Sequence, residues 1–63
     1  MRKAKPIVIQ SILDSAAELF GERPFHAVTM DDIAQRAGIS KGTIYSRFKS
    51  KEDLYLGLIL HFG

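Results

Sequence analysis

The sequence predicts an all-α fold, a bundle of three short helices followed by a fourth, linking helix. First, apolar residues in the N-terminal third recur three and four positions apart, which is the spacing of one helix face. Second, a serine or threonine stands just ahead of three later segments, where a helix N-cap is expected. Third, 63 residues without a cysteine make one small domain whose core holds by packing alone.

The first predicted helix runs from about Pro6 to Phe20, behind a basic, unstructured arm over residues 1–6. Proline is favoured at the first helical position because its fixed φ suits a helix and its missing N–H has no partner there. Gly21 and Pro24 are expected to end the helix, and the folded domain covers residues 7–63. The stripe expected to face the core is Ile9, Ile12, Leu13, Ala16, Ala17 and Phe20, with Asp14, Ser15, Glu18 and Glu22 on the other side.

Three predicted N-caps divide the rest of the chain. Residues 25–28 have no helical period and are expected to form a connector, with Phe25 filling the core. Each cap satisfies a backbone N–H at a helix start and contributes about 0.5–2 kcal/mol. Two caps have an acid three residues later, and two have the flanking apolar pair of a hydrophobic staple. The caps are Thr29 (with Asp32), Ser40 and Ser50 (with Asp53), and the staples are Val28–Ile33 and Ile39–Ile44.

The second and third predicted helices, about Met30–Ala37 and Lys41–Phe48, are joined tightly at Gly38. Glycine directly after a helix favours the left-handed conformation that ends it. Two short helices joined in this way form a helix-turn-helix, the homeodomain-like arrangement that places its second helix in the major groove of DNA. A fourth helix is predicted from about Lys51 to the end of the chain.

The outer side of the third helix is suited to double-stranded DNA. At about 100° per residue, Ile44 and Phe48 lie together and face the core. The opposite side is small, polar and partly basic, and no acid occurs between Asp32 and Glu52. Glycine lets the backbone approach closely, hydroxyls donate or accept at base edges, and cationic side chains bind phosphate or guanine. The outward set is Lys41, Gly42, Thr43, Tyr45, Ser46 and Arg47.

Charge is unevenly distributed along the chain, although the formal net charge is only +2. Basic residues gather at the start and again between residues 41 and 51, and most acids lie elsewhere. This segregation suits a protein with one phosphate-facing side. At the start of the fourth helix, Lys51, in preference to Lys49, is predicted to hold a backbone phosphate together with helix N–H groups.

No pattern in the chain indicates catalysis, a cofactor or a membrane. With no cysteine, and with His26 and His61 far apart, neither a metal nor a cofactor site is expected. No pair of catalytic acids, nucleophile beside a base or phosphate loop supports an enzyme. No apolar run is long enough to span a bilayer, so a cytoplasmic protein is expected. The alternative function is a helix-turn-helix used for protein contact, which an apolar outer face on the third helix would favour.

Three segments resemble the N-terminal DNA-binding domain of TetR-family transcriptional regulators. They are residues 12–20 (ILDSAAELF), 28–45 (VTMDDIAQRAGISKGTIY) and 48–54 (FKSKEDL), and the resemblance covers about residues 7–60. It implies a three-helix DNA-binding headpiece with a linking fourth helix. It also implies that the protein binds a palindromic operator as a homodimer. Most such proteins repress transcription until a small molecule binds a separate C-terminal domain and releases the protein from the DNA.

The resemblance also implies DNA contacts, carried over residue by residue. Thr29 and Met30 would contact DNA from the start of the second helix, and Lys51 would contact the backbone. The position of Arg47 is often histidine or tyrosine in the family, so a different base preference is expected here. The third helix would contribute Lys41, Gly42, Thr43, Tyr45, Ser46 and Arg47.

Family members continue beyond the headpiece into an effector-binding and dimerising C-terminal domain, which we expect to be absent from this chain. In the predicted fourth helix Leu54 and Leu58 face the headpiece, whereas Leu56, Leu60 and Phe62 point elsewhere. A helix with more than one apolar side requires a second partner. We therefore expect this surface to pack on the missing domain, through which the protein would form its homodimer and bind its small-molecule effector.

Overall fold

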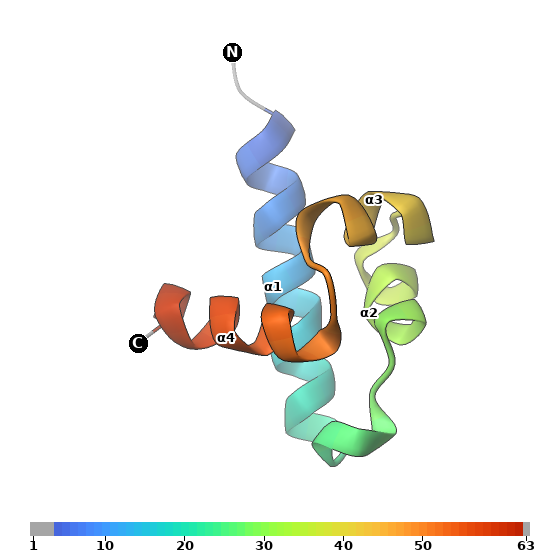
Figure 1. Ribbon diagram of the computed structural model, residues 1–63, viewed down its shortest axis with the longest axis vertical. Helices are drawn as coiled ribbons and strands as arrows, with labels where there is room; N and C mark the ends of the chain where they lie inside the picture. Colours follow the sequence, from blue (N-terminus) through green and yellow to red (C-terminus); the bar gives the residue numbers. More distant parts are fainter. Residues whose placement is uncertain (1–3, 63) are drawn as a thin grey trace.

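The predicted all-α fold is confirmed by the structure (Figure 1). This computed structural model describes the backbone of residues 4–62 and the side chains of residues 8–61. Every regular element within that part of the chain is helical. In chain order the elements are α1 (Ala4–Glu22), the 3₁₀ turn η1 (Phe25–Ala27), α2 (Met30–Ala37), α3 (Lys41–Arg47) and α4 (Lys51–Phe62).

At its N-terminal end, α1 is longer than predicted. It begins at Ala4 instead of Pro6, so the last part of the predicted arm is helical, and residues 1–3 lie outside the described residues. Pro6 is therefore the third helical residue. This position tolerates proline because the first four N–H groups of a helix have no intrahelical acceptor.

At its C-terminal end, α1 runs to Glu22, two residues beyond the predicted end at Phe20. Gly21 does not end the helix, because its φ is not positive. The N–H of Arg23 still donates to the carbonyl of Leu19 at 3.0 Å, which adds a further bond to the last turn. Glycine favours a helix end only where the backbone turns left-handed, and here it does not.

The buried stripe of α1 is narrower than predicted and slightly rotated. It follows the i, i+3, i+4, i+7 spacing of one helix face, and this face lies against α2 and α4. Ile9, 37% exposed, and Ala17 lie outside it, contrary to the prediction, and Ser15 is buried although it was expected outside. The buried residues of α1 are Ile12, Leu13, Ser15, Ala16 and Leu19.

The predicted helix-turn-helix is present, with both of its N-caps. Thr29 Oγ1 accepts the N–H of Asp32 at 3.0 Å, and Asp32 Oδ2 accepts the N–H of Thr29 at 3.1 Å, which completes the capping box. At the start of α3, Ser40 Oγ accepts the N–H of Thr43 at 3.1 Å. The stapling residue Val28 is wholly buried, so the chain enters α2 at a fixed angle.

Gly38 makes the turn between α2 and α3, as predicted. Its φ is 74° and its ψ is 32°, in the left-handed region, and its N–H donates to the carbonyl of Gln35 at 3.2 Å. The next N–H, of Ile39, donates back to the carbonyl of Ala34 at 3.0 Å. Glycine adopts this backbone without strain, whereas a β-carbon would clash with the neighbouring carbonyl oxygen.

We expect Gly38→Ala to lower the free energy of unfolding by about 1–2 kcal/mol. The cost is conformational, because beyond Gly38 itself and its two chain neighbours a β-carbon at this position meets no atom within 4 Å. Gly21→Ala is the matched control, because a β-carbon there also meets no atom within 4 Å beyond its chain neighbours. The backbone of Gly21 is helical, so alanine should raise the free energy of unfolding by up to about 1 kcal/mol. Urea unfolding followed by circular dichroism measures both, and shifts of the same sign would contradict this account.

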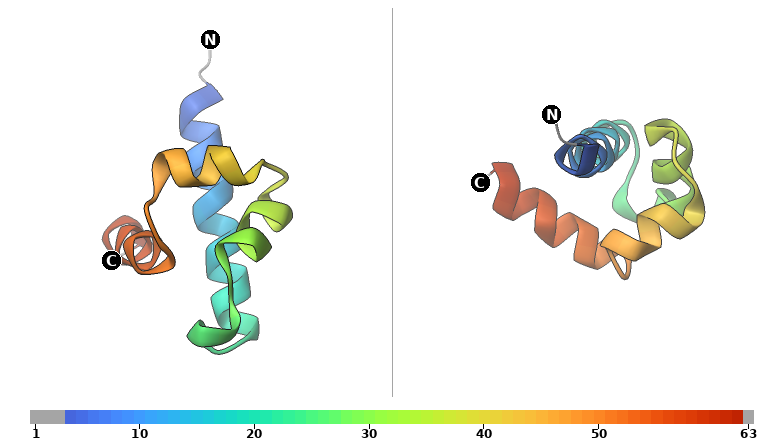
Figure 2. Two further views of the ribbon diagram at one scale, coloured as in Figure 1. Left: turned by 45° about the vertical axis from the view of Figure 1, so that its right-hand side comes forward. Right: turned by 90° about the horizontal axis from the view of Figure 1, so that it is seen from above.

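The helix α4 crosses α1 steeply and completes the core (Figure 2). It starts with the predicted cap, since Ser50 Oγ accepts the N–H of the third helical residue at 3.1 Å. Leu54 and Leu58 are buried against the bundle, as predicted. Phe48 closes this side by packing on Gly57, where a β-carbon would lie 3.1 Å from Phe48 Cε1.

Two aromatic residues differ from the prediction. The helix α3 ends one residue before Phe48, which follows in an extended conformation with φ −135° and ψ 134°. Phe25 lies at the surface, 36% exposed, and does not fill the core. Val28 is the wholly buried side chain of the connector, so Phe25 instead packs against Phe20 and Tyr55.

Candidate nucleic-acid interface

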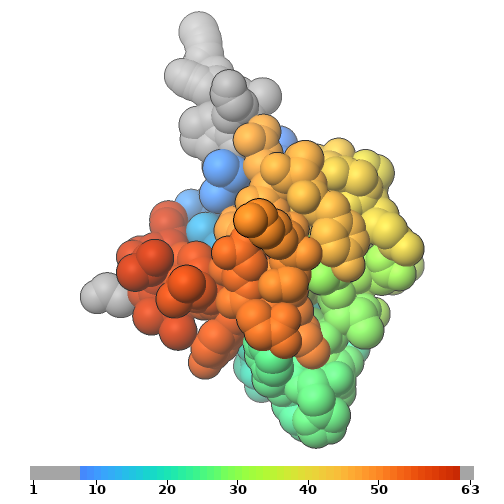
Figure 3. All heavy atoms as spheres, viewed as in Figure 1, coloured from blue at the N-terminus to red at the C-terminus, as the bar shows by residue number. Residues whose placement is uncertain are grey.

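The outer side of α3 is presented to solvent on one face of the molecule. Ile44 is wholly buried and holds α3 on the core, whereas the neighbouring Tyr45 is 47% exposed. Figure 3 shows the atoms of α3 and those of the first turn of α4 side by side on this face. The structure thus brings together the predicted outward residues Lys41, Gly42, Thr43, Tyr45, Ser46 and Arg47, of which Thr43 alone is half-buried.

Hydrogen bonds link three hydroxyl groups at this surface. Ser40 Oγ lies 2.9 Å from Thr43 Oγ1, and Ser46 Oγ donates to the carbonyl of Thr43 at 2.6 Å. A serine hydroxyl has one proton to donate and two lone pairs with which to accept. Because the proton of Ser46 is used within α3, its hydroxyl presents an acceptor to any partner.

The start of α2 contributes one of its two predicted contact residues. Thr29 is exposed, and its hydroxyl oxygen accepts from the backbone of α2, so its proton is free for donation. Met30 is 6% exposed and belongs to the core, so its side chain does not reach this surface. The reason is that Met30, Ile33 and Ala34 follow the i, i+3, i+4 spacing of the buried face of α2.

The two ends of α3 differ in their charge pairing. Lys41 Nζ lies 3.4 Å from Asp31 Oδ1, a contact between exposed groups that contributes little and leaves the ammonium accessible. Arg47 has no carboxylate within ion-pair distance among the described residues. A β-carbon on Gly42 would meet Ser40 Oγ at 3.9 Å and nothing closer, so packing within the protein does not require glycine there.

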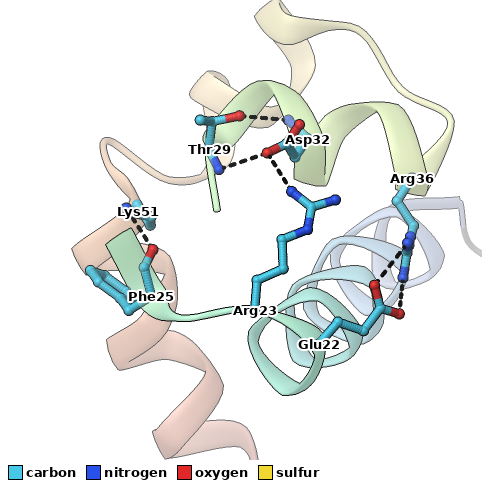
Figure 4. Close-up of polar contacts among 7 residues, drawn as sticks. All are labelled: Glu22, Arg23, Phe25, Thr29, Asp32, Arg36 and Lys51. Atoms are coloured by element: carbon cyan, nitrogen blue, oxygen red, sulfur yellow. Dashed lines mark hydrogen bonds and ion pairs between the residues drawn. The ribbon is translucent and has the colours of Figure 1, made fainter. Parts of the chain in front are cut away.

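Lys51 contacts η1 rather than the outward residues of α3. Its Nζ donates to the carbonyl of Phe25 at 2.8 Å and lies 4.4 Å from the centre of the Phe25 ring (Figure 4). The sequence places these residues 26 positions apart, so neither spacing nor periodicity indicates the contact. One of the three N–H donors of the Lys51 ammonium is therefore engaged on η1.

Ion pairs hold α2 against the end of α1 (Figure 4). Arg36 forms a bidentate pair with Glu22, at 2.8 and 3.2 Å, and also contacts Glu18 Oε1 at 3.3 Å. Arg23, just beyond α1, donates to Asp32 Oδ2 at 3.1 Å, the oxygen that closes the capping box. Bidentate geometry favours one orientation of the two side chains, but all of these groups are partly exposed, so the pairs contribute little to the stability of the fold.

These contacts shift the ionisation of the residues that make them. The hydrogen bond from Arg36 lowers the pKa of Glu22 below its ordinary 4.5, and the same bond raises the pKa of Arg36. The backbone hydrogen bond from Thr29 is the main cause that lowers the pKa of Asp32 below its ordinary 3.8. A carboxyl with a depressed pKa in the folded state stabilises the fold above its unfolded pKa, and this contribution is lost as the pH falls through the folded pKa.

We expect the midpoint of thermal unfolding to fall as the pH is lowered from about 5 to about 3. The reason is that Glu22 and Asp32 begin to lose their stabilising contribution near their ordinary pKa values of 4.5 and 3.8. A variant carrying Glu22→Gln and Asp32→Asn should show a flatter pH dependence. Differential scanning calorimetry of both proteins across this range makes the comparison, and parallel curves would contradict the assignment.

The described part of the chain has neither a membrane-spanning helix nor a cluster of metal-binding side chains. No helix within residues 4–62 is long and apolar enough to cross a membrane. Among the side chains that the structure describes, no three histidine, cysteine, aspartate or glutamate residues are grouped so that they could hold a metal ion.

Comparison with a protein-family model identifies the family to which this helix-turn-helix belongs. Residues 12–58 of the chain match the model described as bacterial regulatory proteins, tetR family. The chain belongs to the TetR family. TetR-family proteins are DNA-binding transcriptional regulators, so the helix-turn-helix of this member is a DNA-binding element.

Several curated members of the TetR family are similar to this chain. The transcriptional activator FasR of Mycolicibacterium smegmatis is 48% identical over 48 residues, which are 76% of this chain and 22% of that protein. The fatty acid metabolism regulator protein of Bacillus subtilis is 40% identical over 58 residues, 92% of this chain and 29% of that protein. The transcriptional repressor KstR2 of Rhodococcus jostii is 51% identical over 43 residues, 68% and 21% respectively. The chain thus spans less than a third of the length of these relatives, and no solved structure matches it significantly.

Proposed function

We propose that this chain is the operator-reading module of a TetR-family repressor that binds a palindromic operator as a homodimer. The observation that carries the proposal is the division of α3 between a wholly buried Ile44 and an exposed, polar, partly basic outer side. The helix α3 would enter the major groove, and α2 would contact the DNA at its first turn. The proposed contact residues are Thr29, Lys41, Gly42, Thr43, Tyr45, Ser46 and Arg47, with Lys51 on a backbone phosphate.

Hydroxyl orientation on α3 supports a particular kind of base reading. Ser46 presents an acceptor, which suits the amino group of adenine or cytosine in the major groove. The methyl group of Thr43 suits contact with a thymine methyl. Arg47 carries a fork of donors suited to the two acceptors of guanine or to a phosphate. Lys41 and Tyr45 lie beside these residues on α3 and are proposed to contact backbone phosphates.

We expect Thr43→Ala and Ser46→Ala to relax base preference without abolishing binding. Each should reduce discrimination at one operator position by about 1–3 kcal/mol, because a contact to a base edge is lost. Binding of each variant to a set of operators changed at single positions measures this. Affinity for non-specific DNA is the control and should not change. An equal loss of affinity for every DNA sequence would contradict a base-reading role.

Exposed apolar side chains on the outer side of α4 support the proposal that this helix packs on a second partner. Leu56, Ile59 and Leu60 are exposed, Leu60 by 75%, and the side chain of Phe62 lies outside the described residues. Apolar residues on a second helix side require a partner surface. We propose that this side packs on a C-terminal domain of a longer cytoplasmic regulator, and that this domain forms the homodimer and binds a small-molecule effector.

A helix-turn-helix used only for protein contact is the alternative function. Such a use calls for an apolar outer surface on α3, because the cores of protein interfaces are depleted of charged residues. On α3 the one large apolar side chain exposed is Tyr45, which also carries a hydroxyl. Lys41 and Arg47 at the two ends of the helix favour DNA instead.

Mapping the DNA sites bound in cells by the full-length regulator tests the proposed function. We expect the sites to share a two-fold symmetric sequence, to lie near promoters, and to be vacated when the effector is supplied. Deletion of the regulator should raise transcription from those promoters. Lowered transcription would identify an activator instead, and bound sites without a shared sequence would contradict operator reading.

A further inference from the structure

Three hydroxyl-bearing residues, Ser40, Thr43 and Ser46, are joined by hydrogen bonds along α3. Ser40 Oγ accepts the backbone N–H of Thr43 at 3.1 Å and lies 2.9 Å from Thr43 Oγ1. The hydroxyl of Ser46 donates to the carbonyl oxygen of Thr43 at 2.6 Å. Ile44 is wholly buried and holds α3 on the core, so the three hydroxyls belong to a helix with a fixed orientation.

The hydrogen bond between the side chains of Ser40 and Thr43 has a direction, because a single proton lies between the two oxygens. Ser40 is exposed, whereas Thr43 is half-buried. Water reaches an exposed hydroxyl easily, but a half-buried hydroxyl depends on a protein acceptor for its proton. Among the described residues, Ser40 Oγ is the hydrogen-bond partner of Thr43 Oγ1. Donation from Thr43 to Ser40 therefore satisfies both groups, and the proton of Ser40 is left to solvent.

With this direction, Thr43 and Ser46 both present lone pairs and no proton to a partner. The proton of Thr43 is used on Ser40, and the proton of Ser46 is used on the carbonyl of Thr43. In the major groove each base pair shows one amino group, on adenine or cytosine, and one carbonyl oxygen, on thymine or guanine. A hydroxyl that can only accept is complementary to the amino group and is left unpaired against the carbonyl oxygen.

We propose that Ser40 is a positioning residue for base reading: by accepting the proton of Thr43, it makes Thr43 and Ser46 an acceptor-only pair that selects adenine or cytosine. The inference rests on the proposed operator-reading function and deepens it, since it names the base edges that α3 selects. Thr43 and Ser46 are three positions apart, so they lie on the same side of α3 and face the same groove. Ser40 acts through the hydroxyl of Thr43.

The first arm of the test identifies the base pair that Thr43 reads. The full-length regulator selects duplexes from a random-sequence library, and its affinity is then measured for duplexes changed at single positions. Thr43→Val keeps the shape and a methyl group of the side chain but removes the hydroxyl, so it should lose discrimination at one base pair. At that base pair the wild-type regulator should prefer the orientation that offers the amino group, by about three- to tenfold over the reversed pair.

The second arm tests whether Ser40 sets this preference. Ser40→Ala frees the proton of Thr43, so the same base pair should be bound about equally in both orientations. Ser40→Asp restores an acceptor and a helix cap, so the preference should return, although its charge weakens binding to every sequence. Combining Ser40→Ala with Thr43→Val should cost no further discrimination, because Ser40 acts through that hydroxyl.

Ser50→Ala is the matched control for Ser40→Ala. Ser50 Oγ caps α4 by the same kind of bond, since it accepts the N–H of Asp53 at 3.1 Å. Loss of either cap should lower the urea midpoint of unfolding by a similar amount. Ser50→Ala should nevertheless keep the wild-type base preference, so a general loss of stability is distinguished from a loss of base reading.

Three results would overturn the inference and leave operator reading by α3 intact. A preference for the orientation that offers the carbonyl oxygen would make Thr43 a donor. An equal loss of affinity for every sequence in Thr43→Val would place its hydroxyl on a phosphate. A preference that survives in Ser40→Ala would show that Ser40 does not set it. A wild-type regulator that selects no shared sequence is a different failure, because it would overturn the proposed function itself.

Discussion

Replacing Ile44 by alanine is expected to unfold a large fraction of the protein. Ile44 is the wholly buried residue through which α3 is held on the core. Truncating a buried isoleucine costs about 2–5 kcal/mol, through lost burial and the cavity left behind. A core in a domain of this size seldom supplies more than about 3–5 kcal/mol in total, so the loss approaches the whole stability. Urea unfolding followed by circular dichroism gives the change directly.

The matched control for this variant is Ile59→Ala. Both residues are isoleucines within helices, but Ile59 lies on the exposed side of α4. Removal of its side chain should change the free energy of unfolding by no more than about 0.5 kcal/mol. A cost for Ile59→Ala equal to that for Ile44→Ala would contradict the division of the chain into a buried core and an unpartnered α4 surface.

The second large effect is expected on DNA binding from Arg47→Ala. Among the described residues Arg47 has no carboxylate partner, and its side chain is exposed at the end of α3. Loss of an arginine contact to guanine should cost about 1–3 kcal/mol of binding free energy and relax the preference at one base pair. If the contact is to phosphate, all sequences should weaken alike and the salt slope should fall by about one unit.

Arg36→Ala serves as the control for Arg47→Ala because it removes the same charge from another face. Arg36 is paired with Glu22 and Glu18 on α1, so it is not available to DNA. Its loss should leave the salt slope unchanged. Fluorescence anisotropy over a range of salt concentrations compares the two variants, and equal losses of slope would contradict the assignment of the DNA-binding face to α3.

The local features of the helix-turn-helix were predictable from the sequence because each depends on neighbouring residues. The capping box of Thr29 and Asp32, the cap at Ser40 and the left-handed Gly38 are all within one turn of the helix ends that they fix. Hydrogen bonds of this kind form between residues three or four positions apart. The bounds of α2 were therefore predicted correctly, and α3 differs by one residue.

Features that depend on contacts between distant segments could not be predicted in this way. Whether Met30 faces DNA or the core is decided by how α2 rotates against α1, and the structure turns it inward. Phe25 is placed outside because Val28 occupies the core position of the connector. The bond between Lys51 and Phe25 joins residues 26 positions apart, which helical periodicity does not relate.

An NMR titration of the labelled protein with a selected duplex tests directly whether the outward side of α3 reads an operator. We expect the largest amide shifts at residues 41–47 and at Thr29, with saturation at a defined stoichiometry, and smaller shifts along the outer side of α4. Shifts centred on Leu56, Ile59 and Leu60 with α3 unaffected, or no saturable binding, would contradict operator reading by α3.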